Sequence, residues 1–299
     1  MRTRRTIAAA LSVLALTAVA ACGKDGSPNA TANDTASKLP TYQVKTDVKL
    51  DGSPTWKKAK ERGNLIIGAK SDQPFLGFED VSSKDRSGFD IEIAKMIAAD
   101  LGFAPGQVKF QTIVSANRET AISGGQVDYY VGTYTINDDR KKQVAFAGPY
   151  MVAGQDLLVR KTNTTITGPE AMAGKSICSA TGSTSLKRVD QYHGKAVKYD
   201  TYAQCVDKLL TDEVDAVTTD DAILKGFAAK NKDQLKVVGK PFSKEPYGIG
   251  LNKTDKVLQD AINAALKAHE DNGDWKKAYD ATLGLSGATS GDIPAIDKS

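Results

Sequence analysis

The sequence predicts an α/β fold with largely parallel sheets, and three observations lead to this class. Segments with the patterns of strands and helices alternate between residues 64 and 270. The chain of 299 residues is long enough for a large core and for about two domains. Its 40% hydrophobic and 25% charged residues are ordinary for a soluble globular protein, which excludes a short peptide module and a low-complexity polymer.

The first half of the pattern supplies three strands and two helices. Residues 64–69 form a short β-branched run before a polar loop, which predicts a buried strand. Residues 89–101 repeat apolar side chains at helical spacing, and Gly102 ends this helix. Further strands are expected at 108–112 and 127–131, with a helix at 118–123 between them.

The second half repeats the alternation. A strand at 177–179 precedes a helix that starts near Ser183, where serine and threonine are typical of a helix start. The last expected helix, 256–270, has an apolar stripe of one valine and several alanines. Between these elements we expect a strand at 197–199, a helix at 202–210 and a strand at 215–218.

Residues 1–21 have the pattern of an export signal. Arg2, Arg4 and Arg5 precede an uncharged apolar run at 7–21. At about 1.5 Å per residue this run spans about 22 Å, which is less than the roughly 30 Å of a bilayer core. We therefore expect a signal peptide, and the alternatives are a short membrane anchor or a buried helix.

The run ends in Val-Ala-Ala-Cys22, which resembles the bacterial lipobox. This motif implies cleavage before Cys22, lipidation of its sulfur and anchoring at the outer face of the cell membrane. Residues 22–54 would then hold the lipid and form a flexible tether, because they are mostly small and polar. Loss of residues 1–21 removes three arginines and no acid, which lowers the net charge from +4 to +1. The basic balance therefore does not argue for a nucleic-acid partner.

The sequence lacks the common catalytic and metal-binding motifs. It contains no P-loop, GxGxxG, GxSxG, CxxC or HExxH pattern, and its only histidines are His193 and His269. We expect no metal, no cofactor and no catalytic residue.

Several segments, in order, resemble the polar amino-acid-binding proteins of ABC importers, which are type II solute-binding proteins. The resemblance covers about residues 55–283 and is greatest to glutamate- or glutamate/aspartate-binding members. The matching segments are GAKSDQPFLGFED (68–80), GFDIEIAKMIAADLG (88–102), VDYYVGTYTINDDRKKQVAFAGPY (127–150), ICSATGSTS (177–185), VDAVTTDDAIL (214–224) and VVGKPFSKEPYGIGLNK (237–253).

The resemblance implies the two-lobed periplasmic-binding-protein type II fold, the Venus flytrap. Each lobe would be a mixed or parallel sheet flanked by helices, and two crossover strands near 147–152 and 241–247 would form the hinge. Lobe 1 would comprise residues 55–149 plus 246–285, lobe 2 would comprise 150–245, and 286–299 would be a flexible tail.

The resemblance also assigns residues to the charged groups of an amino acid, each of which needs a partner when buried. Arg140 matches the arginine that grips the α-carboxylate, and its planar fork suits two parallel hydrogen bonds. The alternative is a surface arginine at a helix start. Asp220 matches the carboxylate that holds the α-ammonium.

Four further positions would offer backbone or hydroxyl groups to the ligand. Thr181 and Gly182 come just before a helix, whose N-terminal amides attract anions, and the same residues also suit an ordinary helix cap. Thr133 and Thr135 match ligand contacts at the end of a strand.

Three positions are implied in side-chain recognition. Lys70 and Arg118 are basic where acidic-amino-acid binders place cations, and an amide ligand would leave one of them unpaired. The alternative is that Lys70 is solvated and that Arg118 lies on a helix surface. Tyr202 matches a position in lobe 2 that contacts the ligand side chain in some members.

Two cysteines remain after Cys22. Cys178 and Cys205 fall in the same expected lobe of an exported protein, where disulfides persist, so we expect them to pair. The alternative is two buried free thiols.

Together these features predict a monomeric lipoprotein that captures L-glutamate, with aspartate as a second candidate, and delivers it to a membrane ABC permease by hinge closure. A glutamine- or asparagine-binding protein of the same fold is an alternative. A ligand-sensing subunit is another. A dehydratase-like enzyme is the last, although no residue stands out as a general acid or base.

Overall fold

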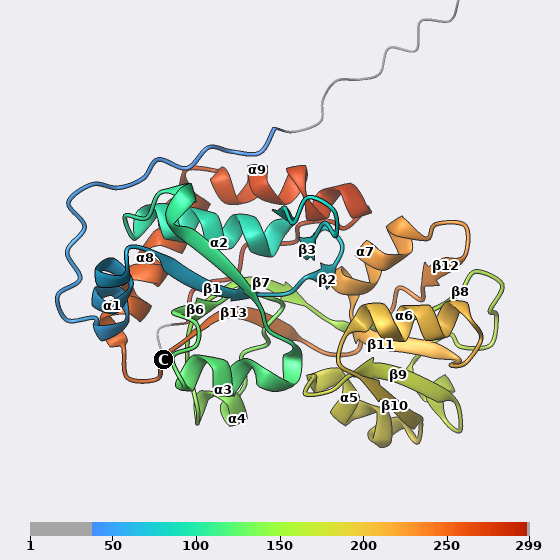
Figure 1. The fold of residues 1–299 in the computed structure, drawn as a ribbon. Coiled ribbons are helices and arrows are strands. Elements are labelled where there is room, and N and C mark those ends of the chain that lie inside the picture. Colours follow the sequence, from blue (N-terminus) through green and yellow to red (C-terminus); the bar gives the residue numbers. More distant parts are fainter. Residues whose placement is uncertain (1–37, 298–299) are drawn as a thin grey trace, which may run out of the picture. The chain divides into compact units, whose positions relative to one another are not determined.

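The structure, a computed structural model, describes residues 38–297. The predicted signal peptide, the predicted lipid attachment at Cys22 and the first part of the predicted tether lie outside the described residues. The described residues form one compact unit, which contains two five-stranded sheets and a small three-stranded one (Figure 1).

The first sheet has the strand order β5-β1-β6-β13-β7. Strand β1 pairs in parallel with β5 and β6, whereas β13 pairs antiparallel with β6 and β7. The strands are β1 (Leu65–Ala69), β5 (Val108–Thr112), β6 (Tyr129–Tyr130), β7 (Ala145–Ala153) and β13 (Glu245–Leu251).

The second sheet repeats this plan in the order β10-β9-β11-β8-β12. Its first three strands are parallel, and the last two are antiparallel to their neighbours. The strands are β8 (Gln155–Arg160), β9 (Ser176–Ala180), β10 (Lys195–Tyr199), β11 (Ala216–Asp220) and β12 (Leu235–Val237). Two mixed sheets on one plan confirm the predicted fold class.

Two long strands carry the chain between the sheets. Strand β7 ends at Ala153 and β8 of the second sheet begins at Gln155, while β13 returns the chain to the first sheet from Glu245. The two strands pair with each other from Glu245 opposite Ala153 to Leu251 opposite Ala145. We call the two halves joined by this pair lobe 1 and lobe 2; their exact residue limits stay predictions.

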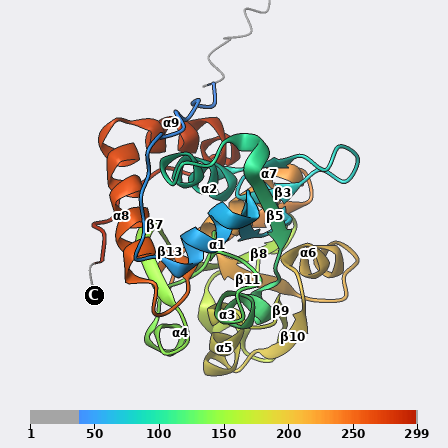
Figure 2. The ribbon, with the colours of Figure 1, turned by 60° about the vertical axis from the view of Figure 1, so that its left-hand side comes forward.

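Helices cover both faces of each sheet (Figures 1 and 2). In lobe 1, α2 (Phe89–Asp100), α8 (Lys256–Asp271) and α9 (Asp274–Ala281) cover one face. On the other face lie α3 (Arg118–Ser123) and α4 (Asp138–Lys141). Helix α1 (Pro54–Arg62) packs beside β1.

In lobe 2, helices α6 and α7 cover one face of the sheet and α5 covers the other. The buried side chains of α6 and α7 belong to one hydrophobic cluster, and that of Val189 in α5 belongs to a separate one. Their bounds are Thr184–Val189 for α5, Tyr202–Leu210 for α6 and Asp221–Lys230 for α7. The small sheet comprises β2 (Asp72–Gln73), β3 (Gly77–Glu79) and β4 (Arg86–Ser87). Short 3-10 helices are η1 (Pro105–Gln107), η2 (Ser115–Asn117), η3 (Pro169–Met172), η4 (Asp190–Tyr192) and η5 (Leu283–Ser286).

One expectation about helices was wrong, because α8 is not the last. Helix α9 follows it after a turn at Gly273, and its Trp275 and Tyr279 rings pack edge-on against Phe89 of α2, 5.3 and 5.2 Å between ring centroids. Half of the residues in its sequence, DWKKAYDA, are charged, so the apolar pattern of a buried helix is weak. The packing of its two aromatic residues against α2 cannot be inferred from the local sequence.

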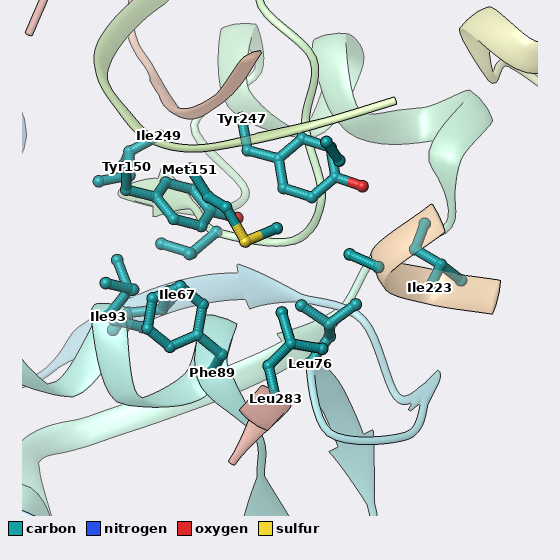
Figure 3. Close-up of a cluster of buried hydrophobic side chains, with 14 of the residues drawn as sticks. Ile67, Leu76, Phe89, Ile93, Tyr150, Met151, Ile223, Tyr247, Ile249 and Leu283 are labelled. Atoms are coloured by element: carbon teal, nitrogen blue, oxygen red, sulfur yellow. The ribbon is translucent and has the colours of Figure 1, made fainter. Parts of the chain in front are cut away.

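The buried cluster around β7 and β13 is mostly aliphatic and includes the aromatic rings of Phe89, Tyr150 and Tyr247 (Figure 3). Tyr150 and Tyr247, one from each crossover strand, have ring centroids 6.1 Å apart and are fully buried. They belong to a single buried cluster with Ile67 of lobe 1 and Ile223 of lobe 2. The two crossover strands therefore contribute side chains to the core of the molecule.

Segments at both ends of the described chain contact lobe 1. Tyr42 donates to Glu92 Oε2 at 3.0 Å, and the Lys45 ammonium lies 2.7 Å from Asp100 Oδ2. Toward the other end, Tyr279 donates to the carbonyl of Thr289 at 2.8 Å. The flexibility predicted for 22–54 and 286–299 stays a prediction. No helix within residues 38–297 has both the length and the apolar composition needed to cross a membrane.

Candidate functional site

Six of the predicted ligand-binding residues meet around one small cavity between the lobes. Its lining comprises Ser115, Arg118, Thr133, Thr135 and Arg140 from lobe 1 and Ser183, Thr184, Tyr202 and Asp220 from lobe 2. The volume is about 10 Å³, close to the minimum of roughly 10–15 Å³ that a single water needs. A larger solute can therefore occupy this place only if the lobes or the lining side chains move.

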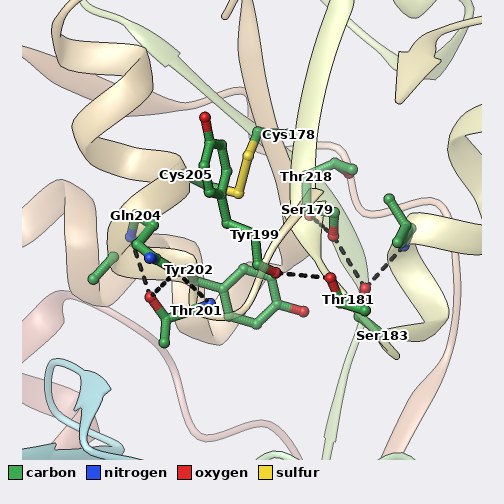
Figure 4. Close-up of a disulfide and its surroundings, with 12 residues drawn as sticks. Cys178, Ser179, Thr181, Ser183, Tyr199, Thr201, Tyr202, Gln204, Cys205 and Thr218 are labelled. Atoms are coloured by element: carbon green, nitrogen blue, oxygen red, sulfur yellow. Dashed lines mark hydrogen bonds between the residues drawn. A yellow bond between two sulfur atoms is a disulfide. The ribbon is translucent and has the colours of Figure 1, made fainter. Parts of the chain in front are cut away.

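A second cavity of about 200 Å³ adjoins the first, and both are lined by Ser115, Arg140 and Thr184. Gly182 lines this second cavity, whereas Thr181 lines neither. Thr181 instead donates its hydroxyl to the carbonyl of Tyr199 at 3.1 Å (Figure 4). The structure therefore brings Gly182, but not the Thr181 side chain, toward the other predicted residues.

Arg140 is placed by the start of α4. Asn137 caps this helix by accepting the backbone N–H of Arg140 at 3.0 Å. The guanidinium donates to the carbonyls of Thr135 at 2.7 Å and Gly182 at 3.1 Å, and its Nε lies 3.3 Å from Glu119 Oε1. Burial, and then the neighbouring Arg118, lower the pKa of Arg140 to about 10. It is therefore not a surface arginine.

Arg118 is equally buried and lies beside Arg140. Its guanidinium donates to the carbonyls of Ser115 at 3.0 Å and Gly182 at 3.3 Å. The Tyr134 ring lies beneath both guanidiniums, with its centroid 4.3 Å from the Arg118 carbon and 4.9 Å from that of Arg140. Cation–π attraction and shared carbonyl acceptors thus hold two like charges together.

Lys70 adds a third cation to this group. Its side chain is almost fully buried at the end of β1, and the ammonium donates to Ser115 Oγ at 2.7 Å. Burial, and then the Arg118 charge, lower the pKa of Lys70 to about 7. The alternative of a solvated lysine is therefore wrong.

Asp220 faces these cations from the end of β11 in lobe 2. Tyr247 donates its hydroxyl to Oδ2 at 2.7 Å, while the buried Oδ1 has no hydrogen-bond partner among residues 38–297. Burial, and then the nearby Glu245, raise the pKa of Asp220 to about 7. A buried carboxylate oxygen without a partner can accept a hydrogen bond from a cationic group that enters the cavity.

The comparisons with known proteins agree with this geometry. The family model for bacterial extracellular solute-binding proteins, family 3, matches residues 65–284. The chain belongs to this family. The fold is accordingly the type II solute-binding fold, with the site between its lobes.

Two curated relatives of this solute-binding protein differ in their ligands. The glutamate-binding protein GluB of Corynebacterium efficiens is 39% identical over 257 residues, which cover 80% of this chain and 87% of the relative. The ABC transporter glutamine-binding protein GlnH of Bacillus subtilis is 34% identical over 273 residues, covering 91% and 94%.

Solved structures agree on the fold. An ancestral arginine-binding protein bound to glutamine has a TM-score of 0.70 and 35% identity, over 75% of this chain and 99% of its own. An ancestral amino acid-binding protein, a precursor of cyclohexadienyl dehydratase, has a TM-score of 0.69 and 28% identity, over 77% and 99%.

The Cys178–Cys205 disulfide fixes the helix that presents Tyr202 to the cavity. It joins β9 to α6, and both half-cystines are fully buried (Figure 4). The predicted pairing is therefore present, and the free-thiol alternative is wrong. Burial raises the pKa of Tyr202 to about 12, so its hydroxyl stays protonated at neutral pH.

Thr133 is held in an unusual conformation. Its φ of 48° lies in the left-handed region, which is rare for a β-branched residue. Its hydroxyl donates to Gln73 Oε1 at 3.1 Å, and its carbonyl accepts from Arg118 at 3.4 Å. Such strain persists only where surrounding contacts impose it, and it is frequent at binding sites.

Sequence reasoning missed four residues that shape this site: Ser115, Glu119, Tyr134 and Tyr247. Ser115 could have been noticed, because it begins the turn that leads to Arg118. Nothing in the sequence pattern marks the other three, since their contacts join segments that are distant along the chain. In residues 38–297 no three His, Cys, Asp or Glu side chains come together to hold a metal ion.

Proposed function

We propose that this solute-binding protein captures L-glutamate, with L-aspartate as a second candidate, outside the cytoplasm and delivers it to an ABC importer. The observation that carries the proposal is the charge of the site. Lys70, Arg118 and Arg140 are buried together. Asp220 is the carboxylate that lines the smaller cavity, and Glu119 of the adjoining cavity already pairs with Arg140. A ligand with two carboxylates and one ammonium matches this excess of positive charge.

The α-groups of the ligand would be divided between the lobes. Arg140 would bind the α-carboxylate, which would replace one of its present carbonyl acceptors, Thr135 or Gly182. The unpartnered Oδ1 of Asp220 would accept from the α-ammonium. Because the two residues lie on different lobes, a ligand bound to both favours closure.

The side-chain carboxylate would pair with Lys70 and Arg118. Within residues 38–297, Lys70 has a single hydrogen-bond acceptor, Ser115, and the three guanidinium hydrogen bonds of Arg118 all go to neutral carbonyls. A neutral amide would give Lys70 and Arg118 no ligand anion to pair with. Only carboxylates of the protein, such as Asp72 and Asp90 near Lys70, would then oppose their charge, at a cost in affinity.

The relatives support an amino-acid ligand and favour one alternative. GluB, named for glutamate, and GlnH, named for glutamine, are both similar to this chain over most of its length. A glutamine-binding protein is therefore the second candidate. It would require Lys70 to be neutral when the ligand is bound.

Calorimetric titration with glutamate, aspartate, glutamine and asparagine tests the proposal. We expect the tightest binding for glutamate, and Lys70→Met should weaken glutamate binding more than glutamine binding. Tighter binding of glutamine would establish the second candidate instead. Release of a keto acid from any of the four would indicate an enzyme, which the proposal excludes.

The cellular part of the proposal concerns the first 54 residues. We propose that residues 1–21 are a signal peptide and that lipidated Cys22 anchors the monomer to the outer face of the cell membrane. Residues 22–54 would include a flexible tether. Fractionation of cells that express Cys22→Ser tests this. The variant should leave the membrane fraction, and persistent membrane attachment would contradict the lipid anchor.

A further inference from the structure

A carboxylate of lobe 1 binds the first backbone amides of a helix in lobe 2. Oδ2 of Asp72, in β2, accepts from the backbone N–H groups of Tyr202 at 3.0 Å and Ala203 at 3.2 Å. These amides begin α6, and the first amides of a helix have no acceptor within it. Thr201, the cap of α6, accepts only the next one, from Gln204 at 3.3 Å. The first two backbone N–H groups of α6 thus find their acceptor, the Asp72 carboxylate, on the opposite lobe.

We propose that Asp72 is a latch that holds the cleft shut and positions Tyr202 against the ligand. The inference deepens the proposed function and rests on it, because Tyr202 lines the cavity assigned to the ligand. Asp72 does not line that cavity. It would act through α6, as a positioning residue rather than a ligand contact.

The location of the latch makes it dependent on closure. At other points the lobes approach so closely that a side chain would not fit. A Cβ at Gly226 of α7 would lie 2.4 Å from the carbonyl oxygen of Pro74, and one at Gly182 would lie 2.7 Å from the Cα of Ala116. When the lobes separate, the distances from Asp72 to α6 must grow and both hydrogen bonds must break. The latch therefore exists only in the closed form.

Helix α6 is suited to transmit this contact. The disulfide at Cys205 ties the helix to β9, so a pull on its first turn moves lobe 2 and does not simply unwind the helix. The carboxylate also faces the positive end of the helix dipole, which strengthens both hydrogen bonds. Tyr202 is the first residue of α6, so the bond to its own N–H holds the backbone from which its side chain projects.

A latch of this kind slows ligand escape without affecting ligand entry. Asp72→Ala should raise the dissociation rate of glutamate at least about tenfold and leave the association rate within about a factor of two. Asp72→Asn, which keeps one acceptor oxygen but loses the charge, should lie between Asp72→Ala and the wild type. Damage to the fold would instead alter both rates and the melting temperature.

The chain provides a matched control. Oδ1 of Asp80 also accepts two backbone N–H groups, from Ser82 and Ser83 at 2.9 Å each, but all three residues belong to the same exposed loop of lobe 1. Asp80→Ala removes the same kind of bond without crossing the cleft. It should leave the dissociation rate unchanged.

Stopped-flow measurement of glutamate association and dissociation on the four proteins decides the matter. A faster dissociation confined to the Asp72 variants supports the latch, and equal rates for Asp72→Ala and wild type overturn it. If wild type binds another of the four amino acids instead of glutamate, the proposed function fails, and the latch is tested by amide exchange in the closed complex with that amino acid. Faster exchange at Tyr202 and Ala203 in Asp72→Ala would then support it, and unchanged exchange would overturn it.

Discussion

Tyr247 donates its hydroxyl to Oδ2 of Asp220 at 2.7 Å, so a residue of a crossover strand is hydrogen-bonded to the carboxylate of the proposed site. This bond stabilises the ionised form of Asp220 and opposes the rise of its pKa by burial. In the proposed mechanism the ligand ammonium needs that ionised form. On this proposal, Tyr247 of the crossover strand would support ligand binding through Asp220 without lining the cavity itself.

We expect Tyr247→Phe to weaken glutamate binding about tenfold at neutral pH, because Asp220 loses a partner and its pKa rises further. Titration calorimetry measures the change. Tyr129→Phe is the matched control, since Tyr129 is a fully buried tyrosine whose hydroxyl donates at 2.9 Å to the carbonyl of Ala94, and neither residue lines the cavity. That variant should lose stability but keep its affinity. Equal losses of affinity in both variants would contradict the prediction.

The affinity for glutamate should be greatest near pH 7. Burial raises the pKa of Asp220 to about 7, so below this pH the carboxyl is protonated and cannot pair with the ammonium. Burial lowers the pKa of Lys70 to about 7, so above this pH the amine is neutral and cannot pair with the side-chain carboxylate. Binding thus releases a proton from Asp220 on the acid side and takes one up at Lys70 on the basic side.

Glutamine provides the control for this pH profile, because its amide does not need a charged Lys70. Its affinity should fall only on the acid side. Calorimetry between about pH 5 and pH 9, in buffers of different ionisation enthalpy, measures both the affinity and the protons exchanged. A flat profile for glutamate across this range would contradict both assignments.

Replacement of Lys70 should separate stability from binding. Lys70→Met is expected to raise the free energy of unfolding of the ligand-free protein by about 1–3 kcal/mol, because a buried ammonium with one neutral acceptor is removed. The folded-state pKa lies below that of the unfolded chain, so the gain should be full below about pH 7 and decline as the pH rises toward 10.5.

The same variant should bind glutamate at least about thirtyfold more weakly. Denaturant unfolding and calorimetry give the two quantities. Lys57→Met is the matched control, because Lys57 is exposed on α1, and it should change neither. A Lys70→Met protein that lost stability would show that the ammonium is better satisfied than its contacts indicate.

Reduction of the Cys178–Cys205 disulfide should lower the free energy of unfolding by about 3–4 kcal/mol, as the chain-entropy model gives for a sequence separation of 27. Urea unfolding with and without a reductant measures this difference. A Cys178→Ala/Cys205→Ala double variant should not respond to the reductant. If the wild type also fails to respond, the disulfide does not contribute to stability in solution.

The sequence predicted most of the scaffold. Strands such as 65–69 and helices such as 89–100 carry periodic apolar patterns that local propensity and burial determine together. Helix α9 was missed because its anchors, Trp275 and Tyr279, depend on packing against α2. Local patterns cannot report a contact whose partner lies far along the chain.

The candidate site was predicted by resemblance rather than by pattern. Arg118, Arg140 and Asp220 meet at one cavity, yet nothing in their local sequences indicates that they would. The contact of Asp72 with α6 and that of Tyr247 with Asp220 also depend on how the two lobes and the crossover strands meet. These contacts arise from tertiary structure, and the periodicity of the sequence does not predict them.

Because the apolar core is continuous between the lobes, the free energy of cleft opening should depend on temperature. Helix α7 of lobe 2 packs against η5 of lobe 1, and Ile223, Leu224 and Leu283 are fully buried in one cluster. Separation of the lobes wets part of this surface, so opening carries a positive heat-capacity change. The attraction that closes the cleft consequently weakens as the temperature falls. Cooling thus reduces the apolar contribution to cleft closure.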